Sequence, residues 1–205
     1  SLIGESYVAT GDKEIFEEVT KNGGKCILTK KDHKTGTDRI FEAYQELKED
    51  SIEYVINLQG DEPMLDIEDV NNLLKKTIEK KSKISTLPCK IEDEKFFLNK
   101  NIVKVTTKEE LHQKNLSKAL SFTREIKNIQ KYIYHHIGIY IYNVSYLEKF
   151  VQLEQTQNEK MQKLEQLRLM DNNIEIDVGL AKTKPIGVDT TEDYIEIKKI
   201  MEYKN

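Results

Sequence analysis

The sequence is poor in cysteine and arginine and has no long apolar run. Cys26 and Cys89 are the only cysteines among 205 residues, so neither a disulfide framework nor a zinc site of spaced thiols is expected. No apolar stretch reaches the length of a membrane span, and no signal-peptide pattern opens the chain. These absences predict a reduced, cytoplasmic protein that is not inserted in a membrane.

The chain also has no excess of basic over acidic residues. The net charge is −4, which argues against a nucleic-acid partner but not against a small phosphorylated substrate, because a divalent metal can bridge carboxylate and phosphate. Charged residues make up 33% of the chain, yet its apolar residues are regularly spaced, as in a soluble globular protein. Only Arg39, Arg124 and Arg168 are arginine among 32 basic residues, which suggests that each is kept for its planar, bidentate side chain.

Strand and helix patterns alternate in the first half of the sequence. Strands are predicted at 6–10, 25–29, 53–59 and 84–91, and helices at 12–22, 37–49 and 66–80. The second half is more antiparallel in character, with strands at 101–107, 116–123, 135–144 and 174–178, and helices at 145–154, 157–171 and from about 190. We therefore predict one α/β domain over residues 1–205 with a mixed, mostly parallel sheet covered by helices.

Two carboxylates interrupt the stretch "YVINLQGDEPML". Asp61 and Glu62 follow a buried strand, and ligands of open parallel sheets bind beyond the carboxyl ends of the strands. A bound cation with a phosphate behind it would explain the pair. Capping of a helix opened by Pro63 explains it equally well.

Three further stretches are ambiguous when each is taken alone. "KTGT" has small residues that would let a planar ligand approach the backbone, but it also resembles an ordinary turn. In "GVDTTED", Thr190 and Asp193 have the spacing of a capping box, and Asp189 could bind a metal or face the helix dipole. In "KLEQLRLM", Glu165 and Arg168 fall on or beside the inward face set by Met161 and Leu164, with a surface ion pair as the alternative.

In order, these stretches resemble the 3-deoxy-manno-octulosonate cytidylyltransferases, or CMP-KDO synthetases. The matching segments run from end to end of the chain: "VATGD", "TKKDHKTGTDR", "NLQGDEP", "NIVKV", "SFTR", "HHIGIY", "LEQLR" and "GVDTTED". The resemblance implies a GT-A-like nucleotidyltransferase with an antiparallel dimerisation extension. It implies transfer of CMP from CTP to 3-deoxy-D-manno-octulosonate (KDO) with Mg²⁺ as cofactor, and a homodimer.

The resemblance also implies roles for individual residues. Asp61 and Asp189 would bind the metal, and Arg124 would act with them and bind the sugar carboxylate. The implied nucleotide contacts are Thr35, Gly36, Thr37 and Asp61. The implied sugar contacts are Gln59, His136, Tyr140, Glu165 and Gln166.

Three departures from the family pattern accompany the resemblance. The family's amino-terminal strand and triphosphate loop do not appear in the 205 residues, so we expect either that they precede Ser1 in the full molecule or that the triphosphate is held incompletely. The stretch between Arg124 and His136 is short and lacks the usual proline-containing segment, which puts the sugar pocket or the dimer contact in doubt. "TGT" replaces "SGT", and Gly11 replaces an acidic residue for which Asp12 would compensate.

Other functions stay open at this point. A cytidylyltransferase for 8-amino-KDO or a sialic-type sugar would have a similar sequence. A catalytically silent sugar-nucleotide-binding module would also fit a chain without the triphosphate loop. A GT-A glycosyltransferase is disfavoured, because "GDE" stands where a D-x-D-like metal motif is expected.

Overall fold

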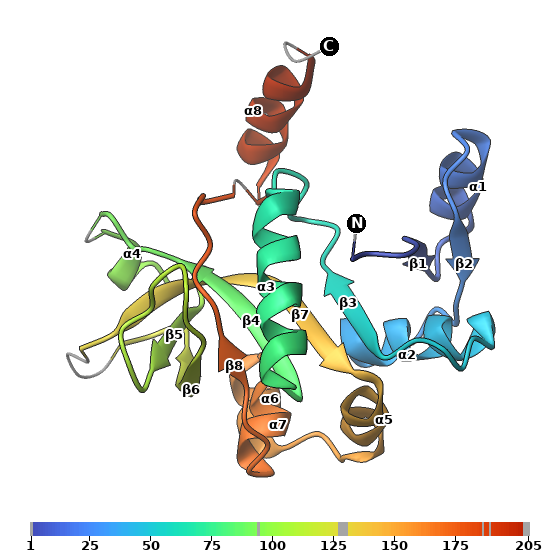
Figure 1. Cartoon of the computed structure of the whole chain (residues 1–205). Helices are drawn as coiled ribbons and strands as arrows, with labels where there is room; N and C mark the ends of the chain where they lie inside the picture. The colour runs from blue at the N-terminus through green and yellow to red at the C-terminus, as the bar shows by residue number, and fades with distance from the viewer. Residues whose placement is uncertain (1, 94, 127–130, 186, 189, 203–205) are drawn as a thin grey trace. The chain divides into compact units, whose positions relative to one another are not determined.

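The computed structural model describes residues 2–93, 95–126, 131–185, 187–188 and 190–202 (Figure 1). The chain divides into two compact units. The first unit comprises residues 1–57 and 141–174, and the second comprises residues 58–140 and 175–205. The division falls within β3 (Tyr54–Leu58) and β7 (Ile133–Asn143), and again after residue 174. The single domain expected from the sequence stays a prediction.

The first unit begins with a β-α-β segment. β1 (Val8–Thr10) pairs in parallel with β2 (Cys26–Leu28), and α1 (Lys13–Lys21) connects them. The Asp12 carboxylate caps α1 by accepting a backbone N–H of its first turn at 2.8 Å. The other helices of this unit are α2 (Gly36–Leu47), α5 (Val144–Gln152), α6 (Gln157–Gln162) and α7 (Leu167–Asp171).

Mixed strand pairing distinguishes the second unit. Its strands are β4 (Ile84–Cys89), β5 (Lys104–Thr107), β6 (Ser117–Thr123) and β8 (Asp177–Val178), and its helices are α3 (Ile67–Lys80), α4 (Lys95–Leu98) and α8 (Thr191–Glu202). The strand order is β3-β7-β4-β8-β6-β5, and β5 also pairs with β7. β4 and β8 are parallel, whereas β5 is antiparallel to β6 and β7, and β6 to β8. The sheet is therefore mixed, as predicted, but only one of these four pairings is parallel, so the expected mostly parallel character is not confirmed.

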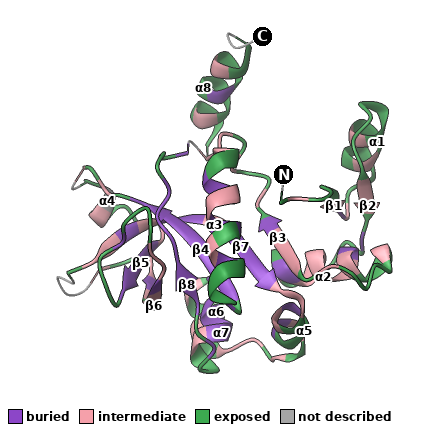
Figure 2. Cartoon of the chain, viewed as in Figure 1, coloured by how far each residue is buried: buried purple, intermediate pink, exposed green. Residues whose placement is uncertain are grey.

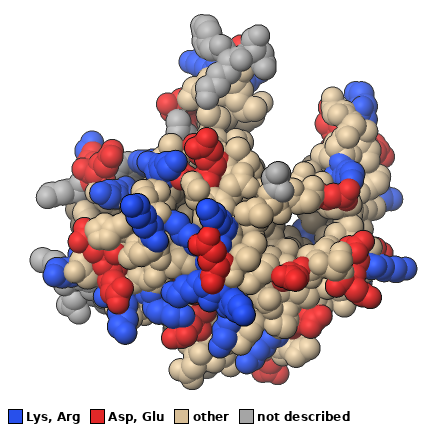
Figure 3. Space-filling view, in the orientation of Figure 1, with Lys and Arg blue, Asp and Glu red and all other residues tan. Residues whose placement is uncertain are grey.

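Burial is concentrated on the central strands. All six residues of β4 are buried, and so is most of β7 (Figure 2). α3 packs on β4, and its buried Val70, Leu73 and Leu74 have the helical spacing that gives the helix one apolar side. On the face shown in Figure 3, acidic and basic side chains are interspersed. Within the described residues, no helix is long and apolar enough to span a membrane.

Most predicted elements are confirmed, with three differences. The helix predicted over 157–171 is two helices, because Lys163 has a φ of 54° that ends α6. Met161 is consequently 76% exposed and does not contribute to an inward face. α4 was not predicted, and β1 and β2 form a separate two-stranded sheet.

Candidate active site

The loop after β3 contains the carboxylate pair noted in the sequence. The Glu62 N–H donates to the Gln59 carbonyl at 3.3 Å, so the chain turns directly after the strand. α3 begins only at Ile67, and its N-cap is Asp66, whose carboxylate accepts a backbone N–H of the first turn at 2.8 Å. The alternative in which Asp61 or Glu62 caps this helix is therefore wrong.

Asp61 presents an exposed carboxylate at the end of this strand. Within the part of the chain that the structure describes, that carboxylate has no hydrogen bond or ion pair. The Asp61 carbonyl, by contrast, accepts the Val188 N–H at 2.8 Å, and a Cβ on Gly187 would lie 3.5 Å from Glu62 Oε1. Residues 187–188 thus fix the loop and leave the carboxylate accessible. Asp189, the other implied metal ligand, lies outside the described residues.

Three implied sugar contacts gather around Gly138 of β7. His136, Gly138 and Tyr140 alternate along the strand, so they face the same side. The His136 and Tyr140 ring centroids are 5.4 Å apart. The Gln59 side chain lies against Gly138, where an added Cβ would be 3.2 Å from Gln59 Cγ. The missing side chain at Gly138 therefore leaves room for the Gln59 side chain.

His136 is buried and neutral. It is 8% exposed, its Nε2 lies 2.9 Å from Thr86 Oγ1, and the Phe122 ring meets it edge-on at 5.1 Å. Burial lowers the pKa of His136 to about 3, and the neighbouring His135 contributes to the shift. At neutral pH the ring can form hydrogen bonds but is not a cationic acid.

Arg124 follows β6 and is fixed through backbone oxygens. Its Nη1 donates to the carbonyls of Asn101 at 2.9 Å and Lys100 at 3.4 Å. Its own carbonyl accepts Lys104 Nζ at 2.7 Å, and Lys104 also donates to the Asn99 carbonyl at 2.5 Å. Burial lowers the pKa of Lys104, and the charge of Arg124 lowers it further. These bonds join the segment after β6 to the segment before β5.

In the first unit, the implied nucleotide contacts form the start of α2. Thr35 is the N-cap, and its Oγ1 accepts the Asp38 N–H at 3.2 Å and donates to Asp38 Oδ2 at 2.8 Å. Gly36 is exposed at the first helical position. Thr37 is fully buried and faces the protein interior.

Thr37 binds Glu165, one of the implied sugar contacts. Its Oγ1 donates to Oε1 of Glu165 at 2.8 Å, and its N–H donates to Oε2 at 3.2 Å. Burial raises the pKa of Glu165, whereas these hydrogen bonds oppose the shift. Gln166, the next residue, is 4% exposed and is the N-cap of α7. The structure thus joins the "TGT" turn directly to the "LEQLR" segment.

Arg168 has the buried role that its place in the sequence predicted, although its partners were not foreseen. It is 2% exposed and binds Glu159 through Nε at 2.9 Å and Nη2 at 2.6 Å. Asp38 lies 3.6 Å from its Nη1, and the guanidinium carbon is 4.2 Å from the Phe150 ring centroid. Glu159 also completes a capping box with Thr156, and the T-x-x-E spacing was the signal that could have identified it.

Arg39 explains the unusual Gly11. The Arg39 Nη1 donates to Thr29 Oγ1 at 2.7 Å and to the Lys30 carbonyl at 2.9 Å. A Cβ on Gly11 would lie 2.8 Å from the same Nη1 and 2.8 Å from Lys31 Cα. A side chain at position 11 would therefore displace this arginine or its loop.

Two other candidates have local structural roles. Thr190 and Asp193 form the expected capping arrangement, in which Asp193 Oδ2 accepts the Thr190 N–H at 2.8 Å and the Asp193 N–H donates to Thr190 Oγ1 at 3.2 Å. His33, in the loop between β2 and α2, also has a local contact: its Nε2 lies 2.5 Å from Glu42 Oε2.

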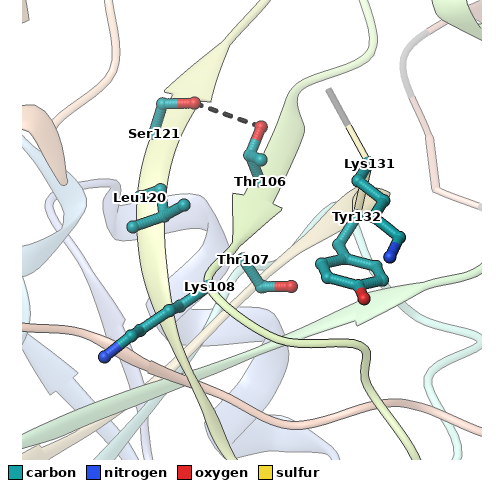
Figure 4. A pocket seen from close by; sticks show the side chains of 7 residues that line it. All are labelled: Thr106, Thr107, Lys108, Leu120, Ser121, Lys131 and Tyr132. Atoms are coloured by element: carbon teal, nitrogen blue, oxygen red, sulfur yellow. Dashed lines mark hydrogen bonds between the residues drawn. The ribbon is translucent and has the colours of Figure 1, made fainter. Parts of the chain in front are cut away.

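The second unit also contains a pocket between β5, β6 and the segment before β7. None of the implied site residues lines it (Figure 4). Its lining consists of Thr106, Thr107, Lys108, Leu120, Ser121, Lys131 and Tyr132. Lys104, which sequence reasoning missed, lies two residues before the first of these, and its only signal was a lysine inside the apolar run "NIVKV".

Comparison with known proteins identifies related chains. Residues 2–176 match the cytidylyltransferase family model. The 3-deoxy-manno-octulosonate cytidylyltransferase of Thermodesulfovibrio yellowstonii is 42% identical over 204 residues, covering 94% of this chain and 79% of the relative. The Bartonella henselae protein of the same name is 39% identical, covering 98% of this chain and 83% of the relative.

Solved structures agree with these relatives. A CMP:2-keto-3-deoxy-manno-octonic acid synthetase complexed with CTP has a TM-score of 0.85 and 32% identity, covering 99% of this chain and 83% of that one. A UDP-glucose pyrophosphorylase complexed with UDP-glucose has a TM-score of 0.65 at 13% identity, covering 94% of this chain and 73% of that one, which indicates a shared fold alone.

Proposed function

The chain belongs to the 3-deoxy-manno-octulosonate cytidylyltransferase family, and we propose on this premise that it transfers CMP from CTP to KDO. The products are pyrophosphate and CMP-KDO, the activated sugar for the lipopolysaccharide core. The supporting observation within the chain is the grouping of Gln59, His136 and Tyr140 around Gly138. Together these side chains offer an amide, an imidazole and a phenol, which suit a ligand rich in hydroxyl groups.

The reaction is an in-line displacement at phosphorus. The anomeric hydroxyl oxygen forms a bond to the α-phosphorus of CTP, its proton leaves to solvent, and the bond to pyrophosphate breaks. Arg124 is the proposed partner of the sugar carboxylate, because guanidinium groups bind carboxylates through charge-assisted hydrogen bonds. Thr35 and Gly36, at the start of α2, are the proposed cytidine contacts.

A hard divalent cation fits the loop after β3. Carboxylate oxygens are the ligands that Mg²⁺ prefers, and Mg²⁺ is often held by one or two carboxylates plus substrate phosphates. The accessible Asp61 carboxylate provides one such ligand, and Asp189 is the proposed second. When bound, the cation neutralises the charge that develops on the triphosphate.

The test is pyrophosphate release from CTP by the full-length protein with KDO and Mg²⁺. We expect Asp61→Asn to lower kcat at least about a hundredfold, because a metal ligand is lost. Asp50→Asn, the same change at an exposed site, should leave the rate unchanged. Full Mg²⁺-dependent turnover by Asp61→Asn would remove the central assignment. Faster turnover with 8-amino-KDO or a sialic-type sugar would change the acceptor, and a folded protein inactive with all three would indicate a silent binding module.

We also propose that the chain forms a homodimer through a β5–β6 surface, defined as the seven residues that line the pocket in Figure 4. Leu120 on this surface is 57% exposed. Ser121 and Thr106 bond at 3.2 Å, and Lys131 Nζ lies 5.1 Å from the Tyr132 ring centroid. Leu120 would supply an apolar contact in the middle of this surface, and the polar groups beside it would form a rim, the arrangement that protein interfaces commonly have.

A further inference from the structure

Thr86 connects two parts of β7 through one hydroxyl group. Its Oγ1 lies 2.9 Å from Nε2 of His136 and 2.6 Å from the carbonyl oxygen of Ile139. Thr86 is fully buried in β4, so water does not compete for these contacts. The three groups belong to the second unit, and the imidazole is the one assigned above to the sugar.

The hydrogen atoms in this arrangement can be counted. A threonine hydroxyl has one hydrogen, and a carbonyl oxygen can only accept. The Thr86 hydrogen must therefore go to Ile139, so the contact with His136 forms only if Nε2 donates. A neutral imidazole has one N–H, which leaves Nδ1 with the ring's free lone pair.

The surroundings of the ring keep it neutral. Two aromatic rings pack against it, Phe122 at 5.1 Å and Tyr140 at 5.4 Å, and burial lowers its pKa to about 3. His135, the adjacent histidine, is also neutral at pH 7, because burial lowers its pKa to about 4.

We propose that Thr86 is a positioning residue that fixes His136 as the Nε2–H tautomer, so that Nδ1 accepts a hydrogen bond from a hydroxyl group of the acceptor sugar. A lone pair binds a hydroxyl donor and repels a carboxylate, so the ring also orients the acidic sugar with its carboxylate elsewhere. The tautomer follows from the fold alone, whereas the sugar contact rests on the proposed function.

Imidazole ¹⁵N spectra of the ligand-free, full-length protein test the tautomer. His136 is identified by the signals lost in His136→Asn. The wild type and Thr86→Ser, which keeps the hydroxyl, should show the Nε2–H form, and Thr86→Val should show a mixture or the other tautomer. An Nδ1–H ring in the wild type, or an unchanged spectrum in Thr86→Val, would overturn the proposal.

Steady-state kinetics test the sugar contact. Thr86→Val should raise KM for KDO about tenfold, the effect of one hydrogen bond, with little change in KM for CTP. Thr86→Ser should stay close to the wild type, and thermal unfolding of all variants verifies that they fold. An unchanged KM for KDO in Thr86→Val would overturn the contact. If the wild type shows no KDO-dependent turnover, the proposed acceptor fails, whereas the spectra still decide the tautomer.

Discussion

The arginine side chains show how far a single residue can be understood from its type. Their scarcity suggested that each is kept for bidentate recognition of an anion. Arg168 does bind a carboxylate with two nitrogens, but the carboxylate is Glu159 of the same chain. Arg39 and Arg124 instead donate to backbone carbonyls. The residue type predicted bidentate binding of an anion at Arg168, but it could not predict which group the fold would place beside each arginine.

The bidentate ion pair between Arg168 and Glu159 leads to a prediction about stability. Arg168→Lys keeps the charge but loses the bidentate pair with Glu159 and the contact with the Phe150 ring, and both groups are buried. We expect the free energy of unfolding to fall by about 3 kcal/mol, measured by urea denaturation. Lys160→Ala, at an exposed site next to Glu159, should change it little. Equal stability of Arg168→Lys and the wild type would show that charge alone suffices.

Among the secondary-structure elements, β8 depends on a buried carboxylate. Asp177 is 3% exposed and accepts hydrogen bonds from Ser82 at 2.6 Å and Lys80 at 2.9 Å, and it pairs with Lys118 at 3.1 Å. Burial acts to raise the pKa of Asp177, but these partners hold it below its usual value of 3.8. A lowered pKa means that the folded state favours the ionised form, so the stabilisation is present above pH 4 and is lost in more acidic solution.

Asp177→Asn tests this dependence. We expect about 2 kcal/mol lower stability at pH 7, because charge-assisted hydrogen bonds are lost. The difference from the wild type should shrink as the pH falls below about 4, because the unfolded chain takes up a proton at Asp177 there while the folded protein resists it. Urea denaturation between pH 7 and acid measures the stability loss and its change with pH. Glu175→Gln is the control, because Glu175 is an exposed partner of the same Lys118. A difference that persists in acid would assign the effect to packing instead of charge.

Helices and strands with a clear pattern of apolar residues were predictable from the sequence. α3 has apolar residues at helical spacing, and β4 is an uninterrupted buried strand, so both were found with small errors at their ends. The 157–171 region was predicted as one helix because periodicity does not show a left-handed residue such as Lys163. α4 has four residues, too few for a periodic signal.

The candidate site was less predictable than the elements around it. His136 and Tyr140 came from the family resemblance, and the alternation of side chains along β7 explains why they share one face. The bond between Thr37 and Glu165 joins residues 128 positions apart, and no local pattern contains that information. Lys104 and Thr86 were missed for the same reason, since a buried polar residue in an apolar strand is explained only by its partners in space.

At the scale of the whole molecule, the sequence predicted the fold class better than it predicted the oligomeric state. The α/β nucleotidyltransferase fold with a mixed sheet is established, and its described residues include no helix suited to a membrane. Assembly depends on surface complementarity, which one sequence does not record. The proposed homodimer therefore has to be argued from the exposed side chains of the β5–β6 surface.

The oligomeric state tests that surface directly. We expect the wild type to elute as a dimer in size-exclusion chromatography with light scattering, and Leu120→Asp to shift the population to monomer, because a buried carboxylate without a partner opposes association. Leu98→Asp is the matched control, since Leu98 is 85% exposed on α4 and is not part of the β5–β6 surface. A dimeric Leu120→Asp would place the interface elsewhere on the molecule. A monomeric wild type at micromolar concentration would exclude a stable dimer and leave the exposed leucine without this explanation.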